Sequence, residues 1–172
     1  MKKILASIFV VALVAGSVLI FSFTQKTQYV CMPCGNECDN TVYDKPGTCP
    51  HCHLKLVDKS TIHLRNIQPE EICQYISSHP NIVLLDVRTK EEFEGKSNPD
   101  YGTLKNAVNV PVQELESRIS ELDQYKSKEI IVYCSHSHRS PMATYILMQH
   151  GFGNVTNMLG GMSVVKDGSC KK

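Results

Sequence analysis

The chain has 172 residues, a formal net charge of +1 and no tryptophan. This length accommodates one ordinary domain with something small beside it. The near-neutral charge, with no basic run away from the ends, argues against nucleic-acid binding. Five of the eight cysteines fall within 22 residues, at positions 31, 34, 38, 49 and 52. This clustering indicates one metal-type site plus single thiols, not a disulfide framework along the chain.

The N-terminus joins a Lys2-Lys3 head to an uncharged run of 20 residues from Ile4 to Phe23. As a helix, such a run spans about 30 Å, the thickness of a bilayer core. We expect residues 1–23 to form an uncleaved signal anchor, with a cleaved signal peptide ending near Ala15 as the alternative. Because the lysines should stay in the cytoplasm, the later residues are expected outside it, membrane-anchored or secreted.

Residues 24–60 contain two C-x-x-C pairs with 14 residues between them. Each pair can place two thiolates on adjacent corners of a tetrahedron. So short a segment buries little core, and a metal would supply its folding energy. We expect one structural zinc ion, and no organic cofactor, with two disulfides as the alternative. The expected ligands are Cys31, Cys34, Cys49 and Cys52, whereas Cys38, His51 and His53 are expected to be exposed polar residues.

This segment resembles the small, ribbon-like heavy-metal-binding modules of bacterial metal-handling proteins. The matching stretches are Tyr29-Val30-Cys31 and Pro46-Gly47-Thr48-Cys49-Pro50-His51-Cys52. Cys34 stands where that pattern has a histidine, and His53-Leu54 replaces its Gly-Met pair. Loss of the methionine argues against Cu(I) and toward an all-thiolate zinc site.

Residues 61–172 have the composition of an α/β domain. Apolar runs predict strands at 62–64, 81–87, 107–110, 129–133 and 153–158. Helices are predicted from Pro69 to Ile76, after a Thr89 cap, over 112–122, and from Pro141 to about Gly151 behind a Ser140 N-cap. Strands that alternate with helices predict a mainly parallel sheet covered by helices on both faces.

The loop from Cys134 to Arg139 lies between a predicted buried strand and a helix N-terminus. Backbone N–H groups of such a loop can converge on one point, where the helix dipole also favours negative charge. That environment lowers the pKa of a thiol and stabilises an anion beside it. Cys134 is therefore a candidate reactive thiol.

Several motifs in order, over Thr61 to Val165, resemble those of the single-domain rhodaneses. They are Leu84-Leu85-Asp86-Val87-Arg88, Glu92-Phe93, Ala107-Val108-Asn109-Val110-Pro111, Val132-Tyr133-Cys134, Arg139-Ser140 and Leu159-Gly160-Gly161. The chain departs from the family at Gly102–Ala107, before the Asn-x-Pro strand, and at Met162, where the family has tryptophan. The resemblance implies a rhodanese-like fold and a sulfurtransferase that moves sulfane sulfur from a donor such as thiosulfate to a thiol acceptor, small or protein-bound.

On this resemblance Cys134 is the catalytic nucleophile and persulfide carrier. Arg139 would hold the anionic donor or fix the loop. Asp86 and Arg88, at a strand end near the site, are expected to form a structural ion pair or brace the loop, in preference to a catalytic role. His136 and His138 would add partial positive charge. The implied substrate-binding residues are Ser135, His136, Ser137, His138, Arg139 and Ser140.

Two other functions remain open. Phosphatases use a wider Cys-x5-Arg loop for a tetrahedral phosphate, so the four residues between Cys134 and Arg139 disfavour that activity. The second is a non-catalytic module that senses or delivers metal or persulfide, in which the rhodanese-like domain docks a partner.

Overall fold

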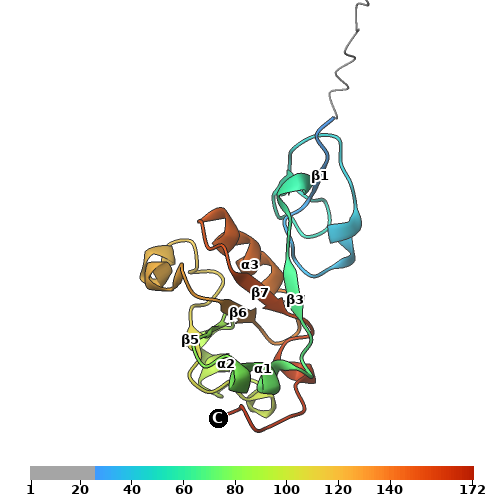
Figure 1. Cartoon of the computed structure of the whole chain (residues 1–172). Helices are drawn as coiled ribbons and strands as arrows, with labels where there is room; N and C mark the ends of the chain where they lie inside the picture. The colour runs from blue at the N-terminus through green and yellow to red at the C-terminus, as the bar shows by residue number, and fades with distance from the viewer. Residues whose placement is uncertain (1–25) are drawn as a thin grey trace, which may run out of the picture.

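The computed structural model describes residues 26–172, which form a small Cys-rich module and a larger α/β domain (Figure 1). In the module, β1 (Tyr29–Cys31) pairs antiparallel with β2 (Leu56–Asp58). The expected signal anchor, residues 1–23, lies outside the described residues. Among residues 26–172, no helix has the length and apolar character needed to cross a bilayer.

The α/β domain is built on a five-stranded sheet in which every described pairing is parallel. Its order is β3 (Arg65–Ile67), β7 (Val155–Met158), β6 (Ile130–Tyr133), β4 (Val83–Asp86) and β5 (Val108–Asn109). The strands β4, β6 and β7 are buried along their whole length. Continuous burial explains why they read as apolar runs without alternation, and it confirms the predicted α/β sheet.

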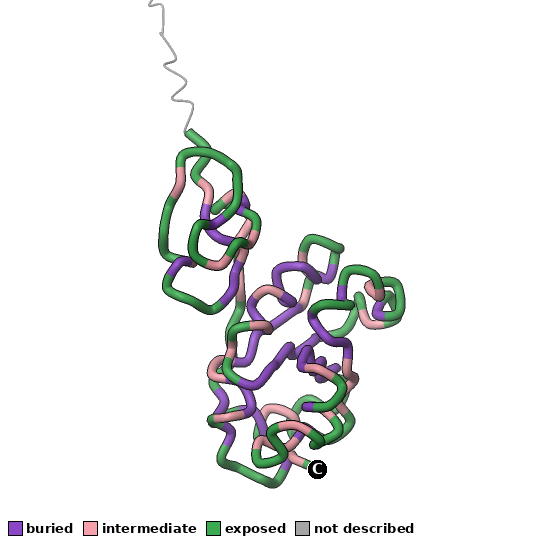
Figure 2. Tube along the Cα trace, turned by 180° about the vertical axis from the view of Figure 1, so that it is seen from behind, coloured by how far each residue is buried: buried purple, intermediate pink, exposed green. Residues whose placement is uncertain are grey.

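Alternate residues of the central strands enter two different cores. Leu85 and Val132 join the core that α3 (Ser140–Gln149) covers through Ala143, Ile146 and Leu147. Leu84 and Ile131 join the core on the opposite face, where α1 (Ile72–Ser78) contributes Ile72. Buried chain accordingly runs through the centre of the larger domain (Figure 2). The predicted covering of both sheet faces is confirmed.

Several predicted boundaries differ from those in the structure. The first strand of the sheet is three residues later than predicted, and Ser140 lies inside α3 instead of capping it. The predicted helix at 112–122 is wrong: turns lead there into a 3-10 helix at Ile119–Tyr125. Leu115 and Leu122 are nevertheless buried in the α3-side core. The apolar spacing thus identified buried residues. The turns and the 3-10 helix, which is wound more tightly than an α-helix, bury them equally well.

Short helices complete the connections. The α-helix α2 (Lys90–Phe93) follows β4, and its Thr89–Glu92 capping box forms as a helix start predicts. Further 3-10 helices occupy Glu37–Asn40, Lys59–Thr61, Pro99–Tyr101 and Met162–Val164.

A disulfide between Cys73 and Cys170 ties α1 to the C-terminal segment.

A fully buried ion pair lies where β4 ends. The Arg88 side chain donates to both carboxylate oxygens of Asp86, with Nη2 2.7 Å from Oδ2. The same Nη2 donates to the carbonyl of Gly102 and the hydroxyl of Thr103. These bonds join the β4 end to the distant 102–103 segment, which confirms the expected structural pairing of Asp86 and Arg88.

We predict that Arg88→Met lowers the free energy of unfolding by about 3–5 kcal/mol, because Asp86 would remain buried without a countercharge. The control is Arg118→Met, which removes exposed pairs to Glu114 and Glu121 and should cost less than about 1 kcal/mol. Denaturant titration measures both changes. Equal losses in the two variants would contradict the structural role assigned to the buried pair.

Candidate functional site

The candidate site lies at the carboxyl edge of the sheet, between β4 and β6. These strands are neighbours, but the chain leaves β4 toward β5 on one side and β6 toward β7 on the other. Such a reversal opens a crevice beyond the strand ends, where α/β proteins bind ligands. The loop after β6 begins with Cys134 and ends at α3, and the segment after β4 contains Glu92.

Cys134 is buried, with 1% of its surface exposed. Its Sγ lies 3.5 Å from Ser140 Oγ. Burial acts to raise the pKa of this thiol. The Ser140 hydroxyl and the backbone N–H groups of Ser140, Arg139 and His136 outweigh burial, so the net pKa is lowered. The loop therefore surrounds the sulfur with donors that stabilise a thiolate.

Arg139 is held by a carboxylate that sequence reasoning did not assign to the site. Its Nη1 and Nη2 donate to the two oxygens of Glu92 at 2.6 and 2.8 Å, and Nη2 also donates to Ser135 Oγ. Ser135 Oγ donates in turn to Glu92 Oε1 at 2.8 Å. Of the two predicted roles for Arg139, this geometry matches fixing of the loop.

The sequence carried a signal for Glu92, because the Thr89-x-x-Glu92 spacing is that of a capping box. The Thr89 backbone N–H donates to Glu92 Oε2 at 3.0 Å. The guanidinium of Arg139 is the main cause that lowers the pKa of Glu92 to about 2, with further donors at Thr89 and Ser135. The Glu92 carboxylate therefore caps the N-terminus of α2 and also holds the loop after β6 in place.

The other predicted substrate-binding residues differ in how far they are exposed to solvent. His136 and His138 are exposed, and His136 Nε2 lies 3.2 Å from the hydroxyl of Tyr101. Ser137 has a φ of 62° and turns its hydroxyl toward the Met158 carbonyl. The two imidazoles are therefore accessible to solvent, whereas Ser135 and Ser140 are buried on the same loop as Cys134.

The Gly160-Gly161 turn packs against the base of the same loop. The N–H groups of Met162 and Ser163 donate to the carbonyls of Cys134 and Ser135. A Cβ on Gly161 would lie 2.5 Å from the Cys134 carbonyl oxygen, and its φ is +66°. Only glycine permits this close approach, which explains the Gly-Gly motif structurally.

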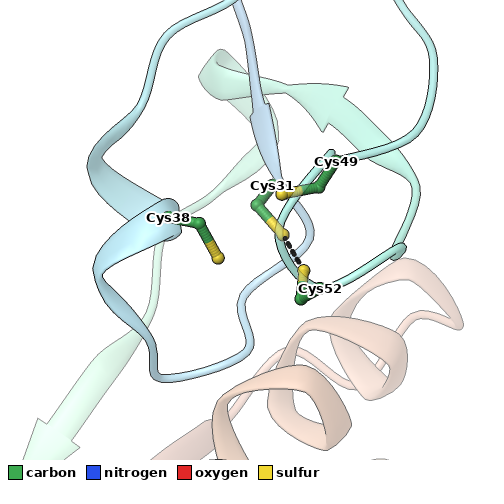
Figure 3. Close-up of side chains that lie close together, drawn as sticks. All are labelled: Cys31, Cys38, Cys49 and Cys52. Atoms are coloured by element: carbon green, nitrogen blue, oxygen red, sulfur yellow. Dashed lines mark hydrogen bonds between the residues drawn. The ribbon is translucent and has the colours of Figure 1, made fainter.

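The Cys-rich module brings together four sulfur atoms, those of Cys31, Cys38, Cys49 and Cys52 (Figure 3). The sequence prediction had Cys34 in place of Cys38, and Cys38 was expected to be exposed. Cys38 is instead buried, and Cys34 also lies near it, in an overlapping group with Cys31 and Asp39. His51 and His53 are exposed as expected.

The cysteines of the module differ in how readily they ionise. The backbone N–H of Cys52 is the main cause that lowers the pKa of Cys49 to about 6. Burial raises the pKa of Cys38 to about 12 and that of Cys31 still further. Crowded, buried thiols resist ionisation unless a positive charge compensates them.

The module rests on the loop that contains Cys134. Gly35 lies so close to Ser137 that a Cβ there would be 2.1 Å from the Ser137 carbonyl oxygen. Met32 packs against the α3-side core, and Thr61, beyond β2, is 3.2 Å from the hydroxyl of Tyr145 in α3. The module therefore lies beside the Cys134 loop.

Comparison with known proteins gives one matching family. The family model of the rhodanese-like domain matches residues 69–167. A sulfurtransferase of Allochromatium vinosum is 29% identical over 58% of this chain and 85% of its own length. A protein of Bacillus subtilis described as a candidate sulfur carrier is 33% identical over 56% of this chain. A tRNA uridine(34) hydroxylase of Cytophaga hutchinsonii is 29% identical over 65%.

The match spans only 48% of the Bacillus protein and 35% of the hydroxylase. Among solved structures, a rhodanese-like domain protein from Staphylococcus aureus aligns with a TM-score of 0.52 and 21% identity. That alignment covers 63% of this chain and 97% of the Staphylococcus chain. It shows a shared fold.

We predict that Glu92→Gln removes up to about 3 kcal/mol of stability near neutral pH, since the pKa of this carboxyl falls from 4.5 to about 2 on folding. A lowered pKa stabilises the fold above about pH 4.5, and that contribution disappears as pH falls toward 2. The wild-type and variant unfolding energies should therefore converge on acidification. Glu91→Gln, an exposed neighbour on α2, is the control. A difference that persists at pH 2 would contradict the ion-pair account.

We further predict that Gly35→Ala changes the alkylation rate of Cys134, because its Cβ would push the module away from Ser137. The positive φ of +72° adds strain. Gly47→Ala is the matched control in the same module, since a Cβ there meets nothing within 4 Å. The measurement is the iodoacetamide rate at Cys134, followed by mass spectrometry. Identical rates in the two variants would contradict the contact.

Proposed function

The chain belongs to the rhodanese-like family, and we propose that it is a sulfurtransferase that carries sulfane sulfur as a persulfide on Cys134. The observation that carries this proposal is the buried thiol at the centre of a six-residue loop of donors. The named activity of the Allochromatium relative supports sulfur transfer in general. Thiosulfate as donor and a thiol as acceptor are our specific proposals.

In the first step the Cys134 thiolate attacks the outer sulfur of thiosulfate. A new S–S bond forms on Cys134, the S–S bond of thiosulfate breaks, and sulfite leaves with the electron pair. The N–H groups of His136, Arg139 and Ser140 hold the thiolate before attack and the persulfide anion after it. Their positions are fixed by the fold, so they need no rearrangement during the reaction.

In the second step an acceptor thiolate attacks the outer sulfur of the persulfide. The S–S bond to Cys134 breaks, and Cys134 returns as a thiolate while the acceptor leaves as a persulfide. The exposed imidazoles of His136 and His138 lie where the acceptor must approach. We assign them a hydrogen-bonding role toward anionic donors and acceptors, because an imidazole N–H can donate to an anion.

The ion pair of Arg139 with Glu92 bears on the choice between sulfur and phosphorus chemistry. A guanidinium engaged by two carboxylate oxygens is less available to clamp a tetrahedral dianion, whether phosphate or thiosulfate. The persulfide, with its single charged sulfur, depends mainly on backbone N–H groups. The preference for the sulfurtransferase over the phosphatase therefore rests on the four-residue spacing between Cys134 and Arg139.

A non-catalytic role in sensing or delivering persulfide is the second candidate. Because the Cys-rich module contacts the Cys134 loop, a structural change in the module would be transmitted to that loop. The lowered pKa of Cys134 favours catalysis, because a passive docking site does not need a reactive thiol.

We also propose an extracytoplasmic location, which the Cys73–Cys170 disulfide supports because disulfides persist in oxidising compartments.

The test is thiocyanate formation by the purified protein from thiosulfate and cyanide, beside phosphate release from an aryl phosphate. We expect thiocyanate to form in the wild-type protein, to fall to the uncatalysed rate in Cys134→Ser, and to persist in Gly47→Ala. Phosphate release without thiocyanate would overturn the proposal. Absence of both activities with an accessible Cys134 thiol would favour the non-catalytic role.

A further inference from the structure

Four thiols of the Cys-rich module have the arrangement of a tetrahedral metal site. The sulfur atoms of Cys31, Cys38, Cys49 and Cys52 all lie within 4.8 Å of one another, and those of Cys31 and Cys52 are 3.1 Å apart. Zinc–sulfur bonds of about 2.3 Å require tetrahedron edges of about 3.8 Å. The four sulfurs are therefore gathered closely enough for one ion to contact all of them. We propose that these four cysteines bind one zinc ion, and that Cys34 lies outside its coordination sphere.

Three separate segments present the four sulfurs from different directions (Figure 3). Cys31 ends β1, Cys38 lies in the 3-10 helix at Glu37–Asn40, and Cys49 and Cys52 flank one tight turn. That turn is closed by the Cys49 N–H to the Leu54 carbonyl and the His53 N–H to the Cys49 carbonyl. Ligands that converge from separate segments enclose an ion on all sides, as a tetrahedral site requires.

Cys34 is occupied elsewhere, although its spacing from Cys31 suggests a ligand. Its Sγ lies 3.1 Å from Asp39 Oδ1 and 3.4 Å from the side-chain nitrogen of Asn36. The carboxylate of Asp39 also accepts from the backbone N–H groups of Cys34 and Gly35, and is fully used in closing this loop. Cys34 is therefore held by contacts within its own loop, beside the group formed by Cys31, Cys38, Cys49 and Cys52.

The competing set of Cys31, Cys34, Cys38 and Asp39 fits zinc less well. It would compete with the backbone donors of Asp39, and it would leave Cys49 and Cys52 uncoordinated although their sulfurs lie in the same group as those of Cys31 and Cys38. In the proposed set, Cys34 has a supporting position instead, with its sulfur 3.5 Å from that of the ligand Cys38. Groups that hydrogen-bond to a ligand orient it and tune its basicity.

The proposed site has a route for metal entry. A cavity of about 650 Å³ opens beside the cluster, and its lining includes two of the four ligands. Cys52 is the most exposed of the four, whereas Cys31 and Cys49 are completely buried. The lining residues are Asn36, Glu37, Cys38, Thr41, His51 and Cys52.

The ligand set has a structural consequence for the neighbouring domain. Cys31 and Cys38 are the two ends of the 32–37 loop, whose Gly35 rests on Ser137. An ion that binds both cysteines would fix both ends of this loop. The proposed set therefore supports the contact with the Cys134 loop.

The test compares cysteine variants of the full-length, reduced protein, with Co²⁺ as a spectroscopic substitute for zinc. We expect one equivalent of zinc by elemental analysis, and tetrahedral four-thiolate absorption with Co²⁺. Cys34→Ser should retain both signals, whereas Cys38→Ser should lose the four-thiolate spectrum. Cys134→Ser should change neither signal, because Cys134 lies in the other domain.

Histidine variants keep the test decisive should Cys38→Ser fail to fold. Cys38→His should shift the Co²⁺ bands to those of three thiolates and one imidazole, while Cys34→His should leave them unchanged. The reverse pattern, with Cys34 variants altered and Cys38 variants unaffected, would overturn the proposed ligand set. Failure of the wild-type protein to bind either ion would overturn the site itself.

Discussion

The ion pair between Glu92 and Arg139 is the interaction on which the candidate site depends. It joins the segment after β4 to the loop after β6, across the crevice where the chain leaves those two strands in opposite directions. With Ser135 also bound to Glu92, both ends of the loop are fixed from one carboxylate. The backbone N–H groups around Cys134 keep their positions because this frame holds them.

The same frame explains why a buried cysteine can remain reactive. Burial alone favours the neutral thiol, as it does for Cys31 in the module. At Cys134 a ring of N–H donors and the Ser140 hydroxyl reverse that preference. The two cysteines are comparably buried, so the difference arises from the donors around Cys134 and the crowded thiols around Cys31, and not from exposure.

On the proposed assignments, each of the eight cysteines has a physical role. Cys134 carries sulfur, four thiols bind a metal, Cys34 supports one of those ligands, and Cys73 with Cys170 closes a disulfide. Metal coordination would also protect the four thiolates from oxidation outside the cytoplasm. The close contact between Gly35 and Ser137 places the proposed metal site and Cys134 in one structural unit.

Local sequence patterns predicted much of this arrangement. The buried strands, the alternation with helices and the loop between β6 and α3 could all be read from apolar runs and turn residues. The Glu92–Arg139 pair could not, because it joins residues 47 positions apart and depends on the strand order. The exchange of Cys34 for Cys38 has a similar cause. The C-x-x-C spacing can be read from the sequence and suggests that Cys34 is a ligand. The contact of Cys34 with Asp39 forms only once residues 32–39 have folded.

The most direct test of the account is the mass of the Cys134 peptide after the protein has been treated with thiosulfate and freed of excess donor. The account predicts a gain of one sulfur atom on that peptide, removed by a thiol reductant and absent in Cys134→Ser. A Cys134 peptide that stays unmodified although its thiol reacts with iodoacetamide would contradict the persulfide on which the proposed function rests.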